Sequence, residues 1–458
     1  MADLPTDEIR LAAKADAATA RRNTRRAIVA STIGTTIEWF DFFLYGFVAA
    51  LVLGKLYFPS KDATTGTLLA FATYFGGFAA RPVGAAIFGH YGDRIGRKKT
   101  LIATLLLMGL ATFAIGLVPT YAAIGVWGGI ILTLLRVIQG IGVGGEWGGA
   151  VLMSVEWGHK GKRGFIASWP QFGVPAGLVL SIGALNLMNA LTTPAQFLAW
   201  GWRVPFLVSI VLVGVGLYIR LGILESPVFT KLREEGKVEK SPVWEVLRLQ
   251  WKEVILTALI RTGQQAPFYL FTTFVLTYGT TVLKFKTGDI LNDVLAASIV
   301  SLFTIPFWGY ISDLVGRKRL YMIGAIVMLL FSFPYFGLLN TRVPLLVFLA
   351  ILVSLPIHDM QYGPLAAITA EAFTGRLRYS GASLGYQLAS ITAGGPAPLI
   401  AIYLFSVYKS AMPIALYMVI CAAVSIVAAA MLVNRDKQDI TVEYKDVGEK
   451  PVPGPAAA

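Results

Sequence analysis

The sequence predicts an all-α polytopic membrane protein with twelve transmembrane helices in two pseudo-symmetric six-helix bundles. Its 458 residues are 56% hydrophobic and only 14% charged, whereas soluble domains carry about 25% charged residues. Twelve apolar runs are long enough to cross a bilayer, which takes about 20 residues each. The second half of the chain also repeats charged motifs of the first half. These three observations together predict the fold class.

The apolar runs divide the chain into five parts. A basic N-terminal arm (1–26) precedes the first bundle (27–222), and a cytoplasmic linker (223–251) leads to the second bundle (252–433). The polar tail (434–458) contains Pro and Gly, and we expect it to be disordered. The twelve spans are expected at residues 27–53, 67–90, 100–118, 122–155, 165–190, 202–222, 252–283, 292–311, 320–339, 344–370, 380–406 and 411–433.

Loops with many lysines and arginines alternate along the chain with loops that have few, and this alternation predicts the orientation of the protein in the membrane. Cytoplasmic loops of membrane proteins carry an excess of basic residues. Besides the N-terminal arm, the rich segments are 92–99, 159–163, 225–251, 316–319 and 375–378. Both termini are therefore expected in the cytoplasm. The same clusters account for the formal net charge of +13, so we expect no nucleic-acid partner.

The chain offers little for enzyme chemistry. Its single cysteine, Cys421, lies in an apolar run, and one cysteine forms neither a disulfide within a monomer nor a cysteine-based metal site. The sequence contains no nucleotide-binding loop, no H-E-x-x-H motif and no convincing nucleophile constellation. We therefore expect no enzyme activity, no metal and no cofactor.

An internal repeat supports the division into two halves. The segment GHYGDRIGRKK (89–99) aligns without gaps to GYISDLVGRKR (309–319), and each joins the second and third spans of its half. Parallel repeats are expected where two bundles rock about a binding site at the membrane midplane. A second repeat, at nearly the same separation, matches Glu156, Arg163 and Ser168 to Glu371, Arg378 and Ser383.

The first copy of this repeat resembles the loop signature of the major facilitator superfamily, G-x-x-x-D-R-x-G-R-[RK]-[RK]. The second copy departs from the signature at Leu314, which replaces the first Arg. The resemblance implies the major facilitator fold of twelve helices and secondary transport by alternating access. The fixed positions are matched by Gly89, Asp93, Arg94, Gly96, Arg97, Lys98 and Lys99.

A narrower resemblance is to the metabolite:proton symporters, which carry α-ketoglutarate, citrate, shikimate, dicarboxylates, and proline or betaine. It implies a multi-pass protein of the bacterial inner membrane that functions as a monomer and couples a small metabolite to protons. The resemblance does not name the substrate. The supporting segments are EWFDFFLYG (38–46), ARPVGAAIFGHYGDRIGRKK (80–99), RVIQGIGVGGEWGGA (136–150), GWRVPF (201–206), ESPVF (225–229) and RYSGASLGYQLAS (378–390).

Two carboxylates, Glu38 and Asp41, lie inside the first predicted span. A charge at the bilayer centre costs at least about 2.5–3.5 kcal/mol on insertion scales. Their spacing puts both on one helix face, with Tyr45 a turn further on. Two nearby carboxylates in a low dielectric do not both ionise comfortably, so we expect one of them to carry the coupled proton. The alternative is that both pair with arginines and lock the fold.

The fourth predicted span carries Arg136, Gln139 and Glu146 on one stripe. The first two match the R-x-x-Q-G motif of the resembled superfamily, whose Arg is implied in coupling. Arg136 either answers Glu38 or Asp41 electrostatically or grips an anionic substrate, and alternation between these partners would couple the two events. Glu146 joins the proton-coupling candidates.

Further candidates for substrate binding lie in the second and seventh spans. Guanidinium groups favour bidentate contact with carboxylates, so Arg81 either contacts the substrate or pairs two helices. Arg261 and Gln265 share one face of the seventh span, which Pro267 is expected to break.

The tenth span places His358, Asp359 and Tyr362 within about one turn. Histidine titrates near neutral pH, so His358 either relays protons or is a satisfied structural group beside its neighbouring Asp. All three are candidates for the substrate site.

The repeated loops are candidates for a cytoplasmic gate. We expect Asp93 to pair with basic residues of the other half and to sit at a helix end, so that charge pairs hold the cytoplasmic side closed and then release it. The candidate gate residues are Asp93, Arg94, Arg97, Asp313, Arg317, Glu156, Arg163, Glu371 and Arg378.

The candidate residues together predict proton-coupled uptake of a small organic acid. Three arginines inside spans, Arg81, Arg136 and Arg261, favour an anionic substrate. The alternative is uptake of a zwitterionic osmolyte such as proline or betaine, which fits the same scaffold. Osmosensing members of the resembled family carry a long heptad tail, and this short tail has no heptads.

Overall fold

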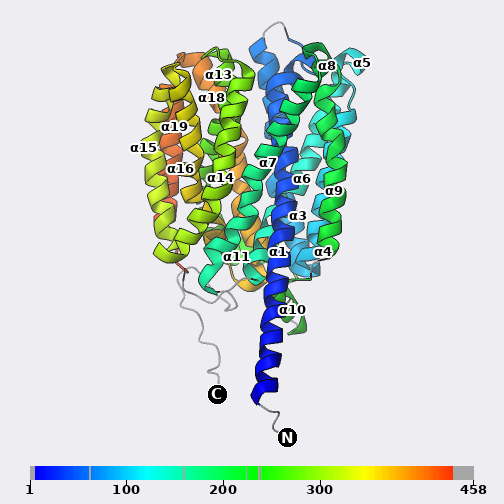
Figure 1. The fold of residues 1–458 in the computed structure, drawn as a ribbon, viewed down its shortest axis with the longest axis vertical. Coiled ribbons are helices and arrows are strands. Elements are labelled where there is room, and N and C mark those ends of the chain that lie inside the picture. Colours follow the sequence, from blue (N-terminus) through cyan, green and yellow to red (C-terminus); the bar gives the residue numbers. More distant parts are fainter. Residues whose placement is uncertain are drawn as a thin grey trace.

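The described part of the chain is entirely helical. The computed structural model describes residues 6–60, 63–157, 160–222, 224–235, 238 and 240–436, and these contain no strand. Long helices run side by side through the whole height of the molecule (Figure 1).

The first half consists of α1 (Thr6–Val48), α3 (Ala63–Ile95), α4 (Arg97–Leu117), α6 (Val126–Trp157), α7 (Arg163–Leu191) and α9 (Val204–Leu221). Its short elements are the π-helical turn η1 (Ala49–Leu53), α2 (Gly54–Leu56), α5 (Tyr121–Ile124), η2 (Lys160–Lys162), α8 (Pro194–Ala199) and η3 (Gly201–Arg203). Two helices connect the halves, α10 (Pro227–Glu234) and α11 (Pro242–Leu249).

The second half consists of α12 (Trp251–Tyr269), α13 (Val275–Thr281), α14 (Thr287–Val315), α15 (Arg317–Asn340), α16 (Pro344–Glu371), α17 (Arg378–Ala389), α18 (Pro396–Tyr408) and α19 (Met412–Met431). The π-helical turn η4 (Leu270–Phe274) continues α12 into α13, and η6 (Ser390–Gly394) leads from α17 towards α18. A short turn, η5 (Gly375–Leu377), precedes α17. Each predicted span coincides with a long helix or with a helix continued through a π-helical turn, which confirms the predicted fold class. Pro267 does not break its helix, because α12 continues to Tyr269 and the irregularity follows in η4.

Two of the predicted spans are unusually polar. Ten helical stretches in the described residues are long and apolar enough to cross a membrane by length and composition, and α3 and α12 are not among them. Each carries an arginine that is buried within the protein, Arg81 in α3 and Arg261 in α12. These helices are therefore held by protein contacts more than by lipid.

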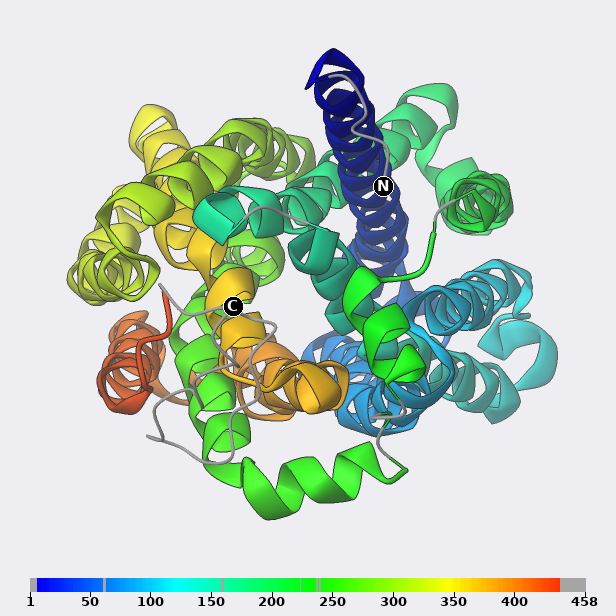
Figure 2. The same ribbon diagram turned by 90° about the horizontal axis from the view of Figure 1, so that it is seen from below.

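The N-terminal arm and the linker contain helices, for which the sequence analysis made no prediction. Because α1 begins at Thr6, the described part of the predicted arm is a helix that continues the first span and projects beyond the bundle (Figure 1). The linker contains α10 and α11, which lie at the same end (Figure 2). Residues 437–458 of the predicted disordered tail lie outside the described residues. The described chain begins and ends at this end of the bundle, as expected if both termini are cytoplasmic.

The halves contact each other through two sets of helices, α7 against α14 and α16, and α17 against α3 and α6. The first glycine of each repeated loop permits these crossings. A Cβ added at Gly309 on α14 would lie 2.6 Å from the Ser168 side chain on α7. A Cβ added at Gly89 on α3 would lie 2.9 Å from the Cα of Ser380 on α17. The same motif position therefore brings the halves together twice.

Candidate functional site

A small polar cavity lies between the two halves. Its volume is about 10 Å³, barely the space that one water molecule needs. The first half contributes Trp39 from α1 and Val174 from α7. The second half contributes Arg261, Gln264, Gln265, Phe268 and Tyr269 from α12, and His358 and Tyr362 from α16. The predicted candidates of the seventh and tenth spans are thus brought together, apart from Asp359, around one small cavity.

Arg261 is the cation in the wall of this cavity. One of its terminal nitrogens donates to the Tyr386 carbonyl, and its guanidinium carbon lies 3.0 Å from the centroid of the Tyr386 ring. In the amide orientation that satisfies its neighbours, Gln265 accepts from Arg261 Nη2 at 3.2 Å and donates to the Ala389 carbonyl at 3.1 Å. The Arg261 Nε has no hydrogen-bond partner in the described chain. The side chain is therefore oriented and retains one unused donor.

His358 is held on both sides. Its Nδ1 lies 2.8 Å from Asp359 Oδ1, and its Nε2 meets the Gln264 amide. The other oxygen of Asp359 accepts from the hydroxyls of Ser301 at 2.7 Å and Thr304 at 2.5 Å on α14. Asp359 thus lies behind His358 in the contact between α14 and α16, where it orients the imidazole.

Tyr362 and Tyr45, the two predicted tyrosines, lie in different surroundings. The Tyr362 hydroxyl lies 3.2 Å from that of Tyr386, beside Arg261. The Tyr45 hydroxyl lies 2.5 Å from Thr73 Oγ1 in the first half. Tyr362 lines the cavity and Tyr45 does not.

The acidic pair on α1 is buried and poorly satisfied. Glu38 is 1% exposed and Asp41 is fully buried. Glu38 Oε2 and both oxygens of Asp41 have no hydrogen-bond partner among the described residues. The positive charges that act on Glu38 are those of Arg81, Arg220 and Arg261. One carboxylate of the first half is therefore within electrostatic reach of the cavity arginine of the second half.

Arg136 does not form a direct ion pair with either carboxylate in the described chain. It donates to Gln139, whose amide donates in turn to Thr112 Oγ1 at 2.7 Å. Its guanidinium carbon lies 4.0 Å from the centroid of the Phe42 ring and 4.4 Å from that of Tyr45. Arg136 therefore lies on an aromatic floor, that is, a surface formed by aromatic rings. It interacts with Asp41 electrostatically, without a direct ion pair.

Arg81 lies on the same aromatic floor. Its guanidinium carbon is 4.0 Å from the ring centroid of Phe42 and 4.5 Å from that of Phe78. All three of its side-chain nitrogens lack a hydrogen-bond partner in the part of the chain that the structure describes. Cation–π contacts stabilise a desolvated guanidinium but leave its hydrogen-bonding capacity unused.

Glu146 has a partner that the sequence analysis did not identify. It forms a buried ion pair with Arg220 at the end of α9, and it accepts from Thr104 Oγ1 at 2.9 Å. Arg220 also donates to the Leu101 carbonyl. Glu146 therefore differs from Glu38 and Asp41, which form no ion pair in the described chain. Arg220 was missed because a basic residue at a cytoplasmic helix end is typical of any membrane protein.

The gate candidates form two matching networks at the end where the chain begins. Asp93 accepts from the backbone nitrogen and hydroxyl of Ser380, both at 2.9 Å, at the start of α17 in the other half. Asp313 accepts from the backbone nitrogens of Gly164 and Phe165, both at 2.9 Å, at the start of α7. Each aspartate thus caps a helix of the opposite half, where the helix dipole favours negative charge.

Buried ion pairs extend each network. In the first, Arg97 lies 3.7 Å from Glu156, which lies 3.6 Å from Arg378. In the second, Glu371 lies 2.6 Å from Arg317 and 3.2 Å from Arg163. Each network connects both halves.

Arg94 is outside these networks. It is exposed, and its contact is with His90 of its own helix at 3.2 Å. The second copy of the motif has no arginine at this position, so its exclusion preserves the symmetry of the gate.

Two further carboxylates extend these networks. Glu225, before α10, accepts from the backbone nitrogens of Arg97 at 3.0 Å and Lys98 at 3.2 Å at the start of α4. Asp436, after α19, accepts from the backbone nitrogen of Arg317 at 3.0 Å at the start of α15. In the sequence, only the ESPVF segment pointed to Glu225, and nothing pointed to Asp436. Both carboxylates bind backbone nitrogens, and such contacts leave no pattern of side chains in the sequence.

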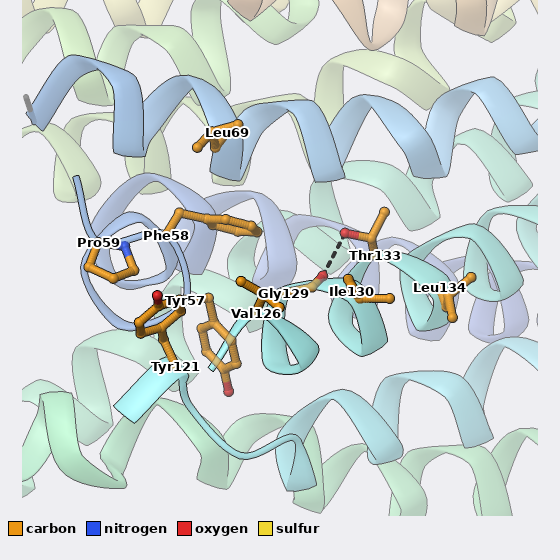
Figure 3. A pocket seen from close by; sticks show the side chains of 10 residues that line it. All are labelled: Tyr57, Phe58, Pro59, Leu69, Tyr121, Val126, Gly129, Ile130, Thr133 and Leu134. Atoms are coloured by element: carbon orange, nitrogen blue, oxygen red, sulfur yellow. Dashed lines mark hydrogen bonds between the residues drawn. The ribbon is translucent and has the colours of Figure 1, made fainter. Parts of the chain in front are cut away.

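A larger pocket lies away from this polar centre, near the turns after α1 and α5. It has a volume of about 500 Å³ and is lined mainly by apolar and aromatic side chains such as Phe58, Tyr121 and Ile130 (Figure 3). The hydroxyl of Thr133 on its wall donates to the Gly129 carbonyl one turn earlier. No charged residue lines the pocket, so it does not offer a site for an ionic metabolite.

The sequence matches two family models. Residues 26–242 match the model described as sugar (and other) transporter, and residues 294–453 match the model of the major facilitator superfamily. The chain is 40% identical to the shikimate transporter of Escherichia coli, over 89% of this chain and 94% of that protein. It is 39% identical to the inner membrane metabolite transport protein YhjE of the same organism, over 88% and 92%. The proline/betaine transporter of E. coli is 32% identical, over 93% and 87%.

Solved structures show the same fold. The proton:xylose symporter XylE bound to 6-bromo-6-deoxy-D-glucose superposes with a TM-score of 0.73, over 90% of this chain and 95% of that chain. A partially occluded inward-open form of XylE from E. coli gives a TM-score of 0.68, over 90% and 97%. The sequence identities of 15% and 17% limit this likeness to the fold.

Proposed function

Since the chain belongs to the major facilitator superfamily and is a multi-pass metabolite transporter rather than an enzyme, we propose that it is a proton-coupled symporter that takes up a small organic acid. The bundles 27–222 and 252–433 rock about the cavity between them, and the membrane is the bacterial inner membrane with both termini in the cytoplasm. The name of the relative YhjE supports that location.

The proposal rests on the burial and the incomplete hydrogen bonding of Arg261. It is a buried cation with one unused donor in the wall of a cavity between two bundles. A carboxylate substrate would supply the missing acceptor and the missing negative charge. Gln265, His358 and Tyr362 surround the same space and would contact the polar groups of the acid.

The proton is assigned to the acidic pair on α1. Glu38 lies in the field of Arg261, so an ionised Glu38 and a substrate carboxylate compete for the same positive charge. Protonation of Glu38 removes that competition and favours substrate binding. Asp41, in the field of Arg136, is the second candidate to carry the proton. Tyr45, Arg81 and Gln139 do not line the cavity and contact other residues of the first half.

The cytoplasmic gate is the proposed moving part. Its two networks join the halves and would have to separate when the cavity opens to the cytoplasm. Because both networks consist of ion pairs and helix caps between equivalent elements of the two halves, the gate opens and closes as one unit.

A zwitterionic substrate is the second candidate. The rings of Trp39, Phe268 and Tyr269 line the cavity, and aromatic rings bind quaternary ammonium groups. The relatedness to the proline/betaine transporter supports this possibility. In that case Arg261 binds the carboxylate and the rings bind the cationic end.

Counterflow and pH-driven uptake in proteoliposomes test the proposal. Purified protein is reconstituted and supplied with radiolabelled shikimate, α-ketoglutarate, proline or betaine in separate assays. Accumulation of an acid that requires an inward proton gradient, together with exchange in its absence, is the expected result. Transport of betaine alone would favour the second candidate, and uptake independent of the proton gradient would contradict proton coupling.

A further inference from the structure

A groove of about 650 Å³ lies between α1 and the start of α7, at the end of the bundle where the chain begins. Helices α1 and α7 pack side by side over much of their length (Figure 1). We infer that this groove is a binding site for one anionic phospholipid of the cytoplasmic leaflet. The inference does not depend on the proposed substrate or on proton coupling.

The mouth of the groove is cationic. Arg25 on α1 and Lys162 just before α7 both line it, and both side chains are exposed. No acidic residue is among the residues that line the groove. Two cations from different segments line the same groove, so they would neutralise a phosphate-bearing headgroup together.

The interior of the groove is apolar. Ile28, Val29 and Ile33 of α1 form one wall, and Trp169 of α7 forms the other. Val29 is 45% exposed in the isolated protein, although it lies within the first membrane span. Tryptophan is enriched where the headgroup and acyl regions of a bilayer meet. An acyl chain would cover this wall while its headgroup reaches the cations.

The depth of these residues fits a lipid better than a soluble anion. The first predicted span begins at residue 27 and the fifth predicted span begins at residue 165. Arg25 and Lys162 therefore lie at the predicted cytoplasmic surface of the bilayer, and the apolar wall lies one to two turns deeper. A free phosphate ion would use the cations but would leave the wall uncovered.

A second groove provides an internal comparison. It lies between α12 and α19, has a volume of about 600 Å³ and is almost entirely apolar. Lys252 is the single cation on its wall. Any phospholipid could fill it by acyl contact. Selectivity for a negative headgroup is therefore expected in the α1–α7 groove and weaker in the second groove.

Native mass spectrometry of the full chain tests the inference. The protein is released from nanodiscs of equal parts phosphatidylglycerol and phosphatidylethanolamine. The bound molecules of each lipid species are then counted. A basic side chain near an anionic surface contributes a factor of about five in affinity, so Arg25→Gln with Lys162→Gln should lower the preference for phosphatidylglycerol by roughly 25-fold. The matched control is Arg26→Gln, an exposed arginine next in sequence that does not line the groove.

The charge-preserving pair Arg25→Lys with Lys162→Arg should retain the preference. A preference unchanged in the glutamine pair, or lowered equally by Arg26→Gln, would overturn the inference. Displacement of the bound lipid by millimolar inorganic phosphate alone would overturn it in favour of a soluble-anion site. Because both side chains are exposed, all variants should elute as the wild type does in size-exclusion chromatography.

Discussion

The two halves have the same gate but different centres. In the gate, Asp93 and Asp313 cap the same kind of helix end in the opposite half. In the centre, the first half buries Glu38 and Asp41, three of whose oxygens accept no hydrogen bond from the described residues, and the second half buries an arginine, a histidine and an aspartate within a hydrogen-bonded network. The two halves therefore share the contacts that join them and differ in the polar residues that they bury.

The largest effect is expected when either member of the acidic pair of the first half, Glu38 or Asp41, is replaced by its neutral amide. A gradient of one pH unit supports about tenfold accumulation with one proton per substrate. Glu38→Gln or Asp41→Asn should remove that accumulation and leave counterflow partly intact, because the neutral side chain no longer exchanges the proton. Uptake of labelled substrate under an imposed pH gradient measures the effect.

Glu146→Gln is the matched control, since Glu146 is a buried carboxylate of the same half that is already paired with Arg220. It should lower thermal stability and keep the proton dependence. Normal pH-driven accumulation in both Glu38→Gln and Asp41→Asn would remove the coupling role from α1.

The next largest effect should come from the second half. Arg261→Gln removes a charge-assisted contact worth about 1.5–3 kcal/mol, so the half-saturating substrate concentration should rise about 10- to 100-fold. Arg261→Lys keeps the charge and should recover part of the affinity. Initial rates of counterflow across a substrate series measure the change. Unchanged affinity in Arg261→Gln would place the substrate elsewhere.

A smaller and symmetrical effect is expected at the gate. Asp93→Asn and Asp313→Asn each weaken one cap between the halves, and each should expose the cytoplasmic side several-fold more often. Ser383 is buried on α17 and Cys421 is the only cysteine. Labelling of Ser383→Cys by a membrane-impermeant maleimide, in a Cys421→Ser background, therefore reports the opening. Effects that differ by more than an order of magnitude would show that the two networks are not equivalent.

The smallest effect should come from the caps outside the repeat. An N-cap contact contributes about 1 kcal/mol. Glu225→Ala should lower the melting temperature more than Asp436→Ala, because Glu225 accepts from two backbone nitrogens at the start of α4 and Asp436 from one at the start of α15. Differential scanning fluorimetry of the two variants measures the order. The reverse order would mean that Asp436, after the last span, contributes more to thermal stability than Glu225 in the linker does.

The sequence predicted the spans and the motif positions more completely than the contacts. Apolar run length and the repeat at 89–99 and 309–319 depend on local composition, so the spans and the division into halves were visible. The partners of these motifs were not visible. Arg220 looked like an ordinary basic helix end, and Ser380 and Asp436 are joined to the gate through backbone nitrogens.

The sequence predicted which residues lie at the centre of the site but not which way their side chains point. Arg261, His358 and Tyr362 do meet at one cavity. Asp359 faces away from it, and Arg136 contacts aromatic rings and a glutamine instead of a carboxylate. Side-chain direction depends on the helices that pack alongside, and these come from distant parts of the chain.

The polarity of α12 has a consequence for how the chain is made. Its arginine costs about 2.5–3.5 kcal/mol at the bilayer centre, and α12 is the first helix of its half to leave the ribosome. Its most extensive contacts in the second half are with α17 and α19, which are synthesised late. Until the final span has been translated, α12 lacks the contacts that shield it from lipid. Integration of the second half is therefore expected to be a late, cooperative event during biogenesis, and a ribosome stalled before α19 should leave α12 outside the membrane or in the care of an insertion chaperone.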